Sequence, residues 1–167
     1  MLDLFKTTGL RFLWISVLIF AFDQWTKYAI VASFKLYESI QITGFFNLTY
    51  VRNYGAAFSF LYDAGGWQVY FLSAVALIVS ALILWWLRQA TKQQLLLPVA
   101  FAFILGGALG NVFDRLLFGY VIDFLDFYYG TYRWPAFNVA DSAIFIGAAL
   151  LIIDMFKNKE ANKLDDE

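Results

Sequence analysis

The chain has 167 residues, of which 62% are hydrophobic, 21% are aromatic and 15% are charged, with a formal net charge of -1. A mean hydropathy of +0.65 is far from that of soluble domains, so the composition predicts one integral membrane domain over residues 1–167. No concentrated basic surface supports a nucleic-acid partner. The sequence contains no cysteine and no histidine, so catalysis would have to use carboxylates, hydroxyls, amides, Lys or Arg.

The first expected membrane span covers residues 12–32. Lys6 and Arg11 precede an apolar run that resembles the start of a secretory signal peptide, but no small-residue cleavage site closes it. Apolar residues continue to about Phe34, which leaves roughly 20 residues, enough to cross a bilayer. We therefore expect a retained transmembrane helix.

Residues 35–62 have a different pattern. The segment ESIQITGFFNLTYV is rich in β-branched and aromatic residues, and Gly44 and the turn at 53–55 divide the region into at least two pieces. This pattern predicts short strands that form a small sheet or hairpin at the membrane surface. The edge of such a sheet could accept a peptide by strand addition.

Three further apolar spans are expected at residues 67–87, 95–113 and 137–156. The first of them ends in an aromatic residue followed by positive charge, as is typical of a membrane interface. An outer connector at 115–136 and a solvated tail at 157–167 complete the chain. The predicted fold class is an all-α membrane protein with four transmembrane helices and a small extracytoplasmic β-sheet or hairpin between the first two.

The distribution of Lys and Arg predicts the orientation. One side of the predicted membrane carries Lys6, Arg11, Arg88, Lys92, Lys157, Lys159 and Lys163, and the other carries Lys27, Lys35, Arg52, Arg115 and Arg133. Because the side of a membrane protein that is richer in Lys and Arg faces the cytoplasm, and both termini lie on that side, we expect cytoplasmic termini. The strand region, the connector and the polar ends of helices one, three and four would then meet at the outer surface.

Two polar pairs occur at helical spacing near that surface. Asp23 and Lys27 are four residues apart, so they can form an ion pair on one helix face, and we favour a structural role for them. Asn111 and Arg115 have the same spacing, with Asp114 between them. This trio could cap the helix or contact a peptide backbone or lipid head group.

Small residues precede the second polar pair. Gly106, Gly107 and Gly110 form a face that allows another helix to approach closely. Packing is the simplest interpretation of these glycines.

Two carboxylates are candidates for chemistry. Asn138 and Asp141 lie three residues apart at the start of helix four, where an isolated Asp would merely stabilise the helix end. Asp123, in the preceding segment, has apolar neighbours, which disfavours a free surface carboxylate. The connector between Asp123 and Asp141 is long enough to bring them together, and Asp126 is a rival for Asp123. For Asp154, a solvated pairing is the better interpretation.

A close pair of carboxylates suits peptide hydrolysis. The two groups cannot easily ionise together, so one keeps its proton near neutral pH. The ionised member can take a proton from an attacking water, while the protonated member polarises the peptide carbonyl and later assists the leaving amine.

Five motifs in order along the chain resemble the lipoprotein signal peptidase family, also called signal peptidase II. The motifs are DQWTK at Asp23–Lys27, RNYGAAFS at Arg52–Ser59, GGALGNVFDR at Gly106–Arg115, VIDF at Val121–Phe124 and PAFNVADSA at Pro135–Ala143. They cover nearly the whole chain, and together they are far more specific than any one alone. Tyr54 departs from the family pattern, which has a smaller or polar residue at that position.

The resemblance implies an intramembrane aspartic peptidase at the outer face of the bacterial cytoplasmic (inner) membrane. It would remove signal peptides from prolipoproteins before a diacylglyceryl-modified cysteine, with the lipid between its helices and without a cofactor or metal. By motif position, the catalytic pair is Asp123 and Asp141, which decides against Asp126. The remaining positions carried over are Asn53, Asn111, Arg115 and Asn138 for substrate binding, and Asp23, Lys27 and Asp114 for structural support. We expect a monomer in contact with membrane lipids.

Two other functional classes compete with the peptidase. Intramembrane acids also mark small transporters and proton relays, whose acids would be distributed through the depth of the bilayer. A purely structural membrane scaffold would leave the polar cluster at one surface unexplained.

Overall fold

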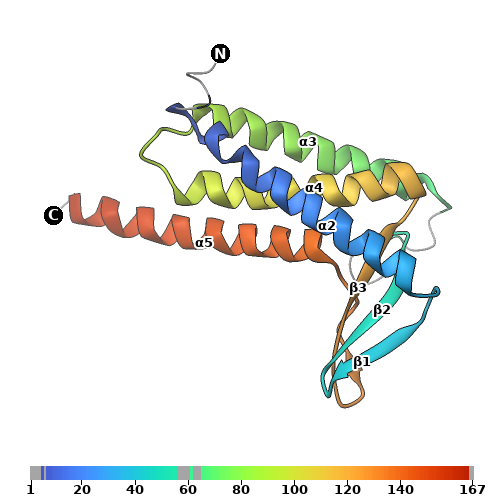
Figure 1. The fold of residues 1–167 in the computed structure, drawn as a ribbon. Helices are drawn as coiled ribbons and strands as arrows, with labels where there is room; N and C mark the ends of the chain where they lie inside the picture. Colours follow the sequence, from blue (N-terminus) through green and yellow to red (C-terminus); the bar gives the residue numbers. More distant parts are fainter. Residues whose placement is uncertain (1–4, 6, 56–60, 62–64, 166–167) are drawn as a thin grey trace.

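The computed structural model describes residues 5, 7–55, 61 and 65–165, with residues 158–165 described as backbone only. Lys6, the end of the expected strand region at 56–60 and 62, and the last two residues of the expected tail lie outside these ranges. The chain folds into helices and strands in the order η1 (Gly9–Phe12), α2 (Leu13–Ser33), β1 (Ser39–Thr43), β2 (Phe46–Asn53), α3 (Trp67–Gln89), α4 (Leu96–Phe118), β3 (Val121–Tyr129), β4 (Tyr132–Arg133) and α5 (Val139–Asp165) (Figure 1).

Four segments of the described chain are helical, long and apolar enough to cross a membrane, as the sequence predicts. They are Gly9–Ser33, Trp67–Gln89, Leu96–Phe118 and Val139–Lys157. Helix α4 continues beyond the expected end at residue 113 because the Asp114 side chain is fully buried and finds partners inside the protein. The helix ends at Phe118 and is capped by Gly119, whose φ of +81° favours glycine.

The sheet corrects the predicted fold class. It has four antiparallel strands in the order β1-β2-β3-β4, so the protein is not purely α-helical. Half of its strands come from the segment after α4, for which the sequence predicts a connector, and not from the region between the first two spans. The sequence does not predict β3 as a strand, because its first four residues, Val121 to Phe124, are all buried and so do not alternate between apolar and polar side chains as a half-buried strand does.

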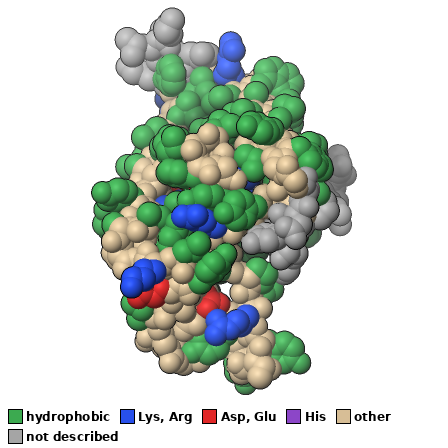
Figure 2. All heavy atoms as spheres, turned by 90° about the vertical axis from the view of Figure 1, so that its right-hand side faces the viewer, with side chains coloured by type: hydrophobic (Ala, Val, Ile, Leu, Met, Phe, Trp, Pro, Cys, Tyr) green, Lys and Arg blue, Asp and Glu red, His purple; other side chains and the backbone are tan. Residues whose placement is uncertain are grey.

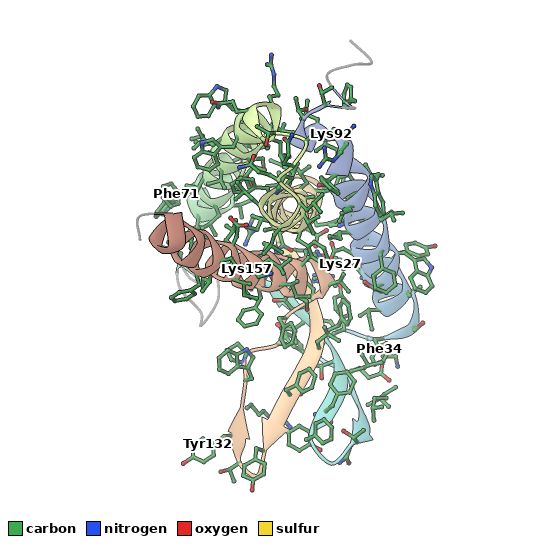
Figure 3. All side chains as sticks on the ribbon, turned by 90° about the vertical axis from the view of Figure 1, so that its left-hand side faces the viewer. Lys27, Phe34, Phe71, Lys92, Tyr132 and Lys157 are labelled. Atoms are coloured by element: carbon green, nitrogen blue, oxygen red, sulfur yellow. The ribbon has the colours of Figure 1, made fainter. Side chains whose placement is uncertain are left out.

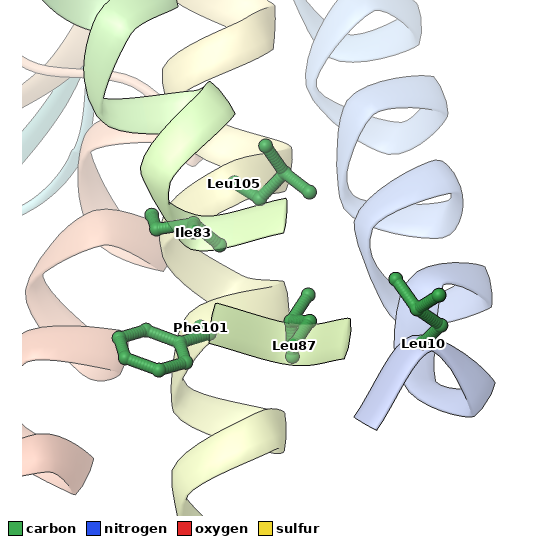
Figure 4. Close-up of a cluster of buried hydrophobic side chains, with 5 residues drawn as sticks. All are labelled: Leu10, Ile83, Leu87, Phe101 and Leu105. Atoms are coloured by element: carbon green, nitrogen blue, oxygen red, sulfur yellow. The ribbon is translucent and has the colours of Figure 1, made fainter. Parts of the chain in front are cut away.

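Helix α4 is the centre of the bundle. Its membrane-spanning window is 61% buried, compared with 17–22% for the other three spans. Figure 3 looks down this helix and shows α2, α3 and α5 around it. A buried apolar cluster lies between α3, α4 and η1 (Figure 4). It consists of Ile83 and Leu87 of α3, Phe101 and Leu105 of α4, and Leu10 of η1.

The sheet projects from one end of the bundle, and a second apolar cluster attaches it there (Figure 1). Ile30 of α2 packs with Tyr50 of β2 and with Ile122 and Phe124 of β3. Seen from the sheet end, hydrophobic side chains cover much of the surface, with few charged side chains among them (Figure 2). Large hydrophobic side chains are also exposed along the helices, which suits a lipid environment, and the cluster fixes the position of β3 relative to the helices.

Close approach of α4 and α5 depends on a glycine at position 107. A Cβ added there would lie 2.3 Å from the carbonyl oxygen of Ala140, which is shorter than any tolerable contact. The absence of a side chain therefore lets the first turn of α5 lie directly against α4.

The Gly107→Ala variant should destabilise the fold by about 1–3 kcal/mol, because the added methyl group pushes α5 away from α4. Thermal unfolding in detergent measures the effect. Gly44→Ala is the matched control, since a Cβ at Gly44 would meet nothing within 4 Å. A Gly107→Ala midpoint equal to that of wild type would contradict the close-packing argument.

Candidate active site

The structure brings the two predicted acids to one cavity at the sheet end of the bundle. Asp123 is in β3 and Asp141 is in the first turn of α5, and both line a cavity of about 1130 Å³. Its other polar lining residues include Asn53, Asn111 and Arg115. Its apolar walls include Ala76 of α3, Ala108 of α4, and Ile144, Phe145, Ile146 and Ala148 of α5.

Two amide side chains hold the Asp123 carboxylate. Strand β2 pairs with β3 so that Asn53 Nδ2 donates to Asp123 Oδ2 at 3.0 Å. Asn138 Nδ2 donates to Asp123 Oδ1 at 2.7 Å. Asp123 is only 2% exposed, so these two bonds replace water around a buried acid.

The Asp141 carboxylate is held by the start of its own helix and by α4. Asn138 and Asp141 form a reciprocal cap, in which Asp141 N–H donates to Asn138 Oδ1 at 2.9 Å and Asn138 N–H donates to Asp141 Oδ2 at 3.3 Å. Asn111 Nδ2 donates to the other carboxylate oxygen, Asp141 Oδ1, at 2.7 Å. Capping and a cross-helix bond together orient Asp141.

The environment of Asp123 favours its protonated form. Burial and, to a smaller extent, the negative charge of Asp141 together raise the pKa of the Asp123 carboxyl to about 7, against the lowering effect of hydrogen bonds from Asn53 and Asn138. A proton is therefore available on this pair near neutral pH. Such a pair can act as acid and base in one reaction.

Arg115 borders the acids with unused hydrogen-bonding capacity. Its Nη2 donates to Gly55 O at 2.9 Å, which ties the end of α4 to the turn after β2. Its Nε is buried and has no hydrogen-bond partner within the described part of the protein.

Asn138 is placed differently from the other predicted substrate-binding residues. Its side chain is fully buried and lies behind the acids, while Asn53, Asn111 and Arg115 line the cavity itself. Its Nδ2 donates to the Asp123 carboxylate, and its Oδ1 accepts the backbone N–H of Asp141, as described above. Asn138 thus holds the two acids in place from behind the cavity.

Asp23, Lys27 and Asp114 form an ion cluster behind the site. Lys27 Nζ lies 2.8 Å from Asp23 Oδ2 and 2.9 Å from Asp114 Oδ2. The sequence predicts only the pair within α2, and the second acid comes from α4. Gln24, a residue of the DQWTK motif for which the sequence predicts no role, donates from Nε2 to Asp114 Oδ1 at 2.8 Å.

Asp126, the rival acid, lies outside the cavity lining. Its Oδ2 accepts from Arg133 Nη1 at 2.5 Å and from Asn47 Nδ2 at 2.9 Å, so its neighbours are the strands of the sheet.

Tyr54, the departure from the family pattern, packs edge-on against Tyr120 with ring centroids 5.5 Å apart. The described residues contain no group of three or more acidic side chains that could hold a metal ion.

Comparison with known proteins decides the family. The family model described as signal peptidase (SPase) II matches residues 15–157. The chain belongs to the signal peptidase II family. The resemblance drawn from the five motifs is thereby confirmed.

Relatives match nearly the whole of this signal peptidase II chain. The lipoprotein signal peptidase of Alteromonas mediterranea is 70% identical over 158 residues, which are 95% of this chain and 87% of the relative. The lipoprotein signal peptidase of Pseudoalteromonas atlantica is 63% identical over 160 residues, which are 96% of this chain and 98% of the relative.

Solved structures share the signal peptidase II fold found here. A bacterial membrane enzyme determined by the in meso method at 2.3 Å resolution superposes with a TM-score of 0.79, with 35% identity over 87% of each chain. A second, determined at 1.9 Å, has a TM-score of 0.75 and 35% identity, over 86% of this chain and 90% of the other. The multi-pass membrane architecture is therefore that of known membrane enzymes.

The raised pKa of Asp123 predicts how stability depends on pH in this signal peptidase II. Between the usual value of 3.8 and about 7, the folded protein binds a proton that the unfolded chain releases, so stability falls as pH rises through this window. Asp123→Asn removes the ionisation. The thermal midpoint of the variant minus that of wild type should therefore increase from about pH 4 to about pH 7.

Asp126→Asn is the matched control for this measurement. This substitution alters another buried acid of β3. The variant should be less stable than wild type because the ion pair between Asp126 and Arg133 is lost. If the thermal midpoint of Asp123→Asn minus that of wild type stayed constant between about pH 4 and about pH 7, the raised pKa of Asp123 would be refuted.

Proposed function

We propose that this protein is an aspartic endopeptidase that removes signal peptides from diacylglyceryl-modified prolipoproteins, cleaving before the lipid-modified cysteine. The observation that carries the proposal is that Asp123 and Asp141 reach one cavity from separate elements. Membership of the signal peptidase II family supports the substrate class. A transporter or proton relay is disfavoured, because these acids and the Asp23–Lys27–Asp114 cluster gather at one end of the helices.

The chemistry follows from one proton shared between Asp123 and Asp141. The ionised acid takes a proton from water as the water oxygen attacks the peptide carbonyl carbon. The protonated acid donates to the carbonyl oxygen as charge develops there. When the C–N bond of the tetrahedral intermediate breaks, the leaving nitrogen receives a proton from the pair, and two products form: a carboxylate end and a new amine.

The cavity provides separate places for peptide and lipid. The Arg115 guanidinium and the Asn53 amide border the acids and supply donors for the substrate backbone. The apolar walls combine Ala76 of α3 with Ile144 and Ala148 of α5, and they suit acyl chains that enter from the bilayer. The substrate would therefore reach the acids while its lipid stays in an apolar environment.

The charge distribution supports an inner-membrane orientation with cytoplasmic termini. The N-terminal end of the helical bundle, the α3–α4 loop and the C-terminal end lie together, opposite the sheet (Figure 1). Arg11 Nη2 donates to the carbonyl oxygens of Lys92 and Gln94, so positive residues gather at that end. We therefore propose that the acids and the sheet lie at the outer face, and that the protein is a monomer in contact with membrane lipids.

Replacing either acid should abolish cleavage. Asp123→Asn and Asp141→Asn should each lower kcat on the order of 10⁴-fold or more, while Asp126→Asn stays within about tenfold of wild type. The assay follows cleavage of a purified diacylglyceryl-modified precursor by each folded variant in detergent. Wild-type activity in either of the first two variants would refute the aspartic mechanism.

The orientation can be tested with single cysteines, because the natural sequence has none. Gly44→Cys in the β1–β2 turn and Thr91→Cys in the α3–α4 loop both place a thiol at an exposed position. A membrane-impermeant maleimide should label Gly44→Cys in intact spheroplasts and Thr91→Cys only after lysis. The reverse pattern would show that the acids face the cytoplasm.

A further inference from the structure

A buried ion cluster made by Asp23, Lys27 and Asp114 lies directly behind the two acids and takes no part in the chemistry proposed above. Its side chains are at most 1% exposed. Lys27 lies between α2 and the centre of the bundle (Figure 3). Three charges in such an environment are costly unless each is paired, so the cluster invites a more specific explanation than helix packing.

Each aspartate of the cluster holds the backbone immediately before one of the two acids. Asp114 Oδ2 accepts the N–H of Ile122, which precedes Asp123, at 3.1 Å. Asp23 Oδ1 accepts the N–H of Ala140, which precedes Asp141, at 2.8 Å. One cluster, built from α2 and α4, therefore anchors β3 and α5 at equivalent points.

Lys27 also reaches both acids through side chains. Its Nζ donates to Asn111 Oδ1 at 3.1 Å, and this contact turns the amide so that Asn111 Nδ2 donates to Asp141. Asn138 Nδ2, which donates to Asp123 Oδ1, shares the same Asn111 oxygen at 3.3 Å. The single ammonium group thus orients the Asn111 amide, which holds Asp141 and whose oxygen also accepts from Asn138, one of the two amides that hold Asp123.

We propose that Lys27 is a positioning residue for hydrolysis, holding Asp123 and Asp141 in their working geometry through Asp114, Asp23 and Asn111. The inference rests on the proposed aspartic mechanism. Catalysis is sensitive to such placement, because a misplacement of about 1 Å can cost on the order of 100-fold in rate. A cluster that only stabilised packing would not need to contact the residue before each acid.

The test separates the rate of chemistry from the amount of folded enzyme. Lys27→Met and Asp114→Ala should each lower kcat roughly 100-fold, with KM within about threefold of wild type. Folded sites are counted by saturable binding of a diacylglyceryl-modified peptide with a reduced scissile bond, and kcat is expressed per binding site. Ser16→Ala is the control, since it removes another buried hydrogen bond between α2 and α4, from Ser16 Oγ to Ala102 O.

Asp114→Asn supplies the conservative rescue and keeps the test decisive if Lys27→Met does not fold. Its amide oxygen can accept from Lys27 and Ile122 as Asp114 Oδ2 does, and Gln24 can turn its own amide to face the new nitrogen. This variant should recover most of the kcat that Asp114→Ala loses. The expected result for Ser16→Ala is a lower thermal midpoint with unchanged kcat per site.

Two results would overturn the inference. One is that Lys27→Met and Asp114→Ala behave like Ser16→Ala, with lower stability and unchanged kcat per site. The other is that Asp114→Asn is as slow as Asp114→Ala. Failure of the proposed function itself looks different, because Asp123→Asn and Asp141→Asn would then remain active whatever the Lys27 variants do.

Discussion

The sheet end of the molecule is organised by the burial of one lysine between two aspartates. Charges removed from water need close partners, and leaving one of them unpaired costs about 3–5 kcal/mol. Lys27 meets that requirement only when α2 and α4 lie at one separation, where its ammonium reaches both Asp23 and Asp114. The position of β3 and the start of α5 then follow, because a backbone N–H from each of them donates to one of these carboxylates.

Small residues make this arrangement sterically possible. A Cβ at Gly110 would lie 2.6 Å from Asp23 Oδ2, and one at Gly107 would meet the backbone of α5. The glycines of α4 therefore do more than bring helices together, since they leave space for a carboxylate in the interior. Apolar packing stabilises the bundle, while the glycines and the buried charges determine how α2, α4 and α5 are positioned relative to one another at the sheet end.

The two acids of the proposed dyad have complementary supports. Asp123 is delivered by a strand and held by amides from β2 and from the residue before α5, while Asp141 begins a helix and is held by its cap and by α4. Burial keeps a proton on the pair near neutral pH, which costs stability in the folded protein. The apolar walls of the cavity beside these acids agree with the lipid-modified substrate of the proposed function.

The sequence by itself determined the membrane class, the four spans and the family. Long apolar runs have one physical solution in a bilayer, and co-linear polar motifs identify Asp123 and Asp141 as candidates. It did not determine the pairing of β3 with β2, because the first four residues of this strand are all buried, so the segment lacks alternation there and resembles a connector. Only the tertiary structure placed Asp114 on Lys27 and Asn138 behind the dyad, since these contacts join residues from different elements whose separation depends on helix packing.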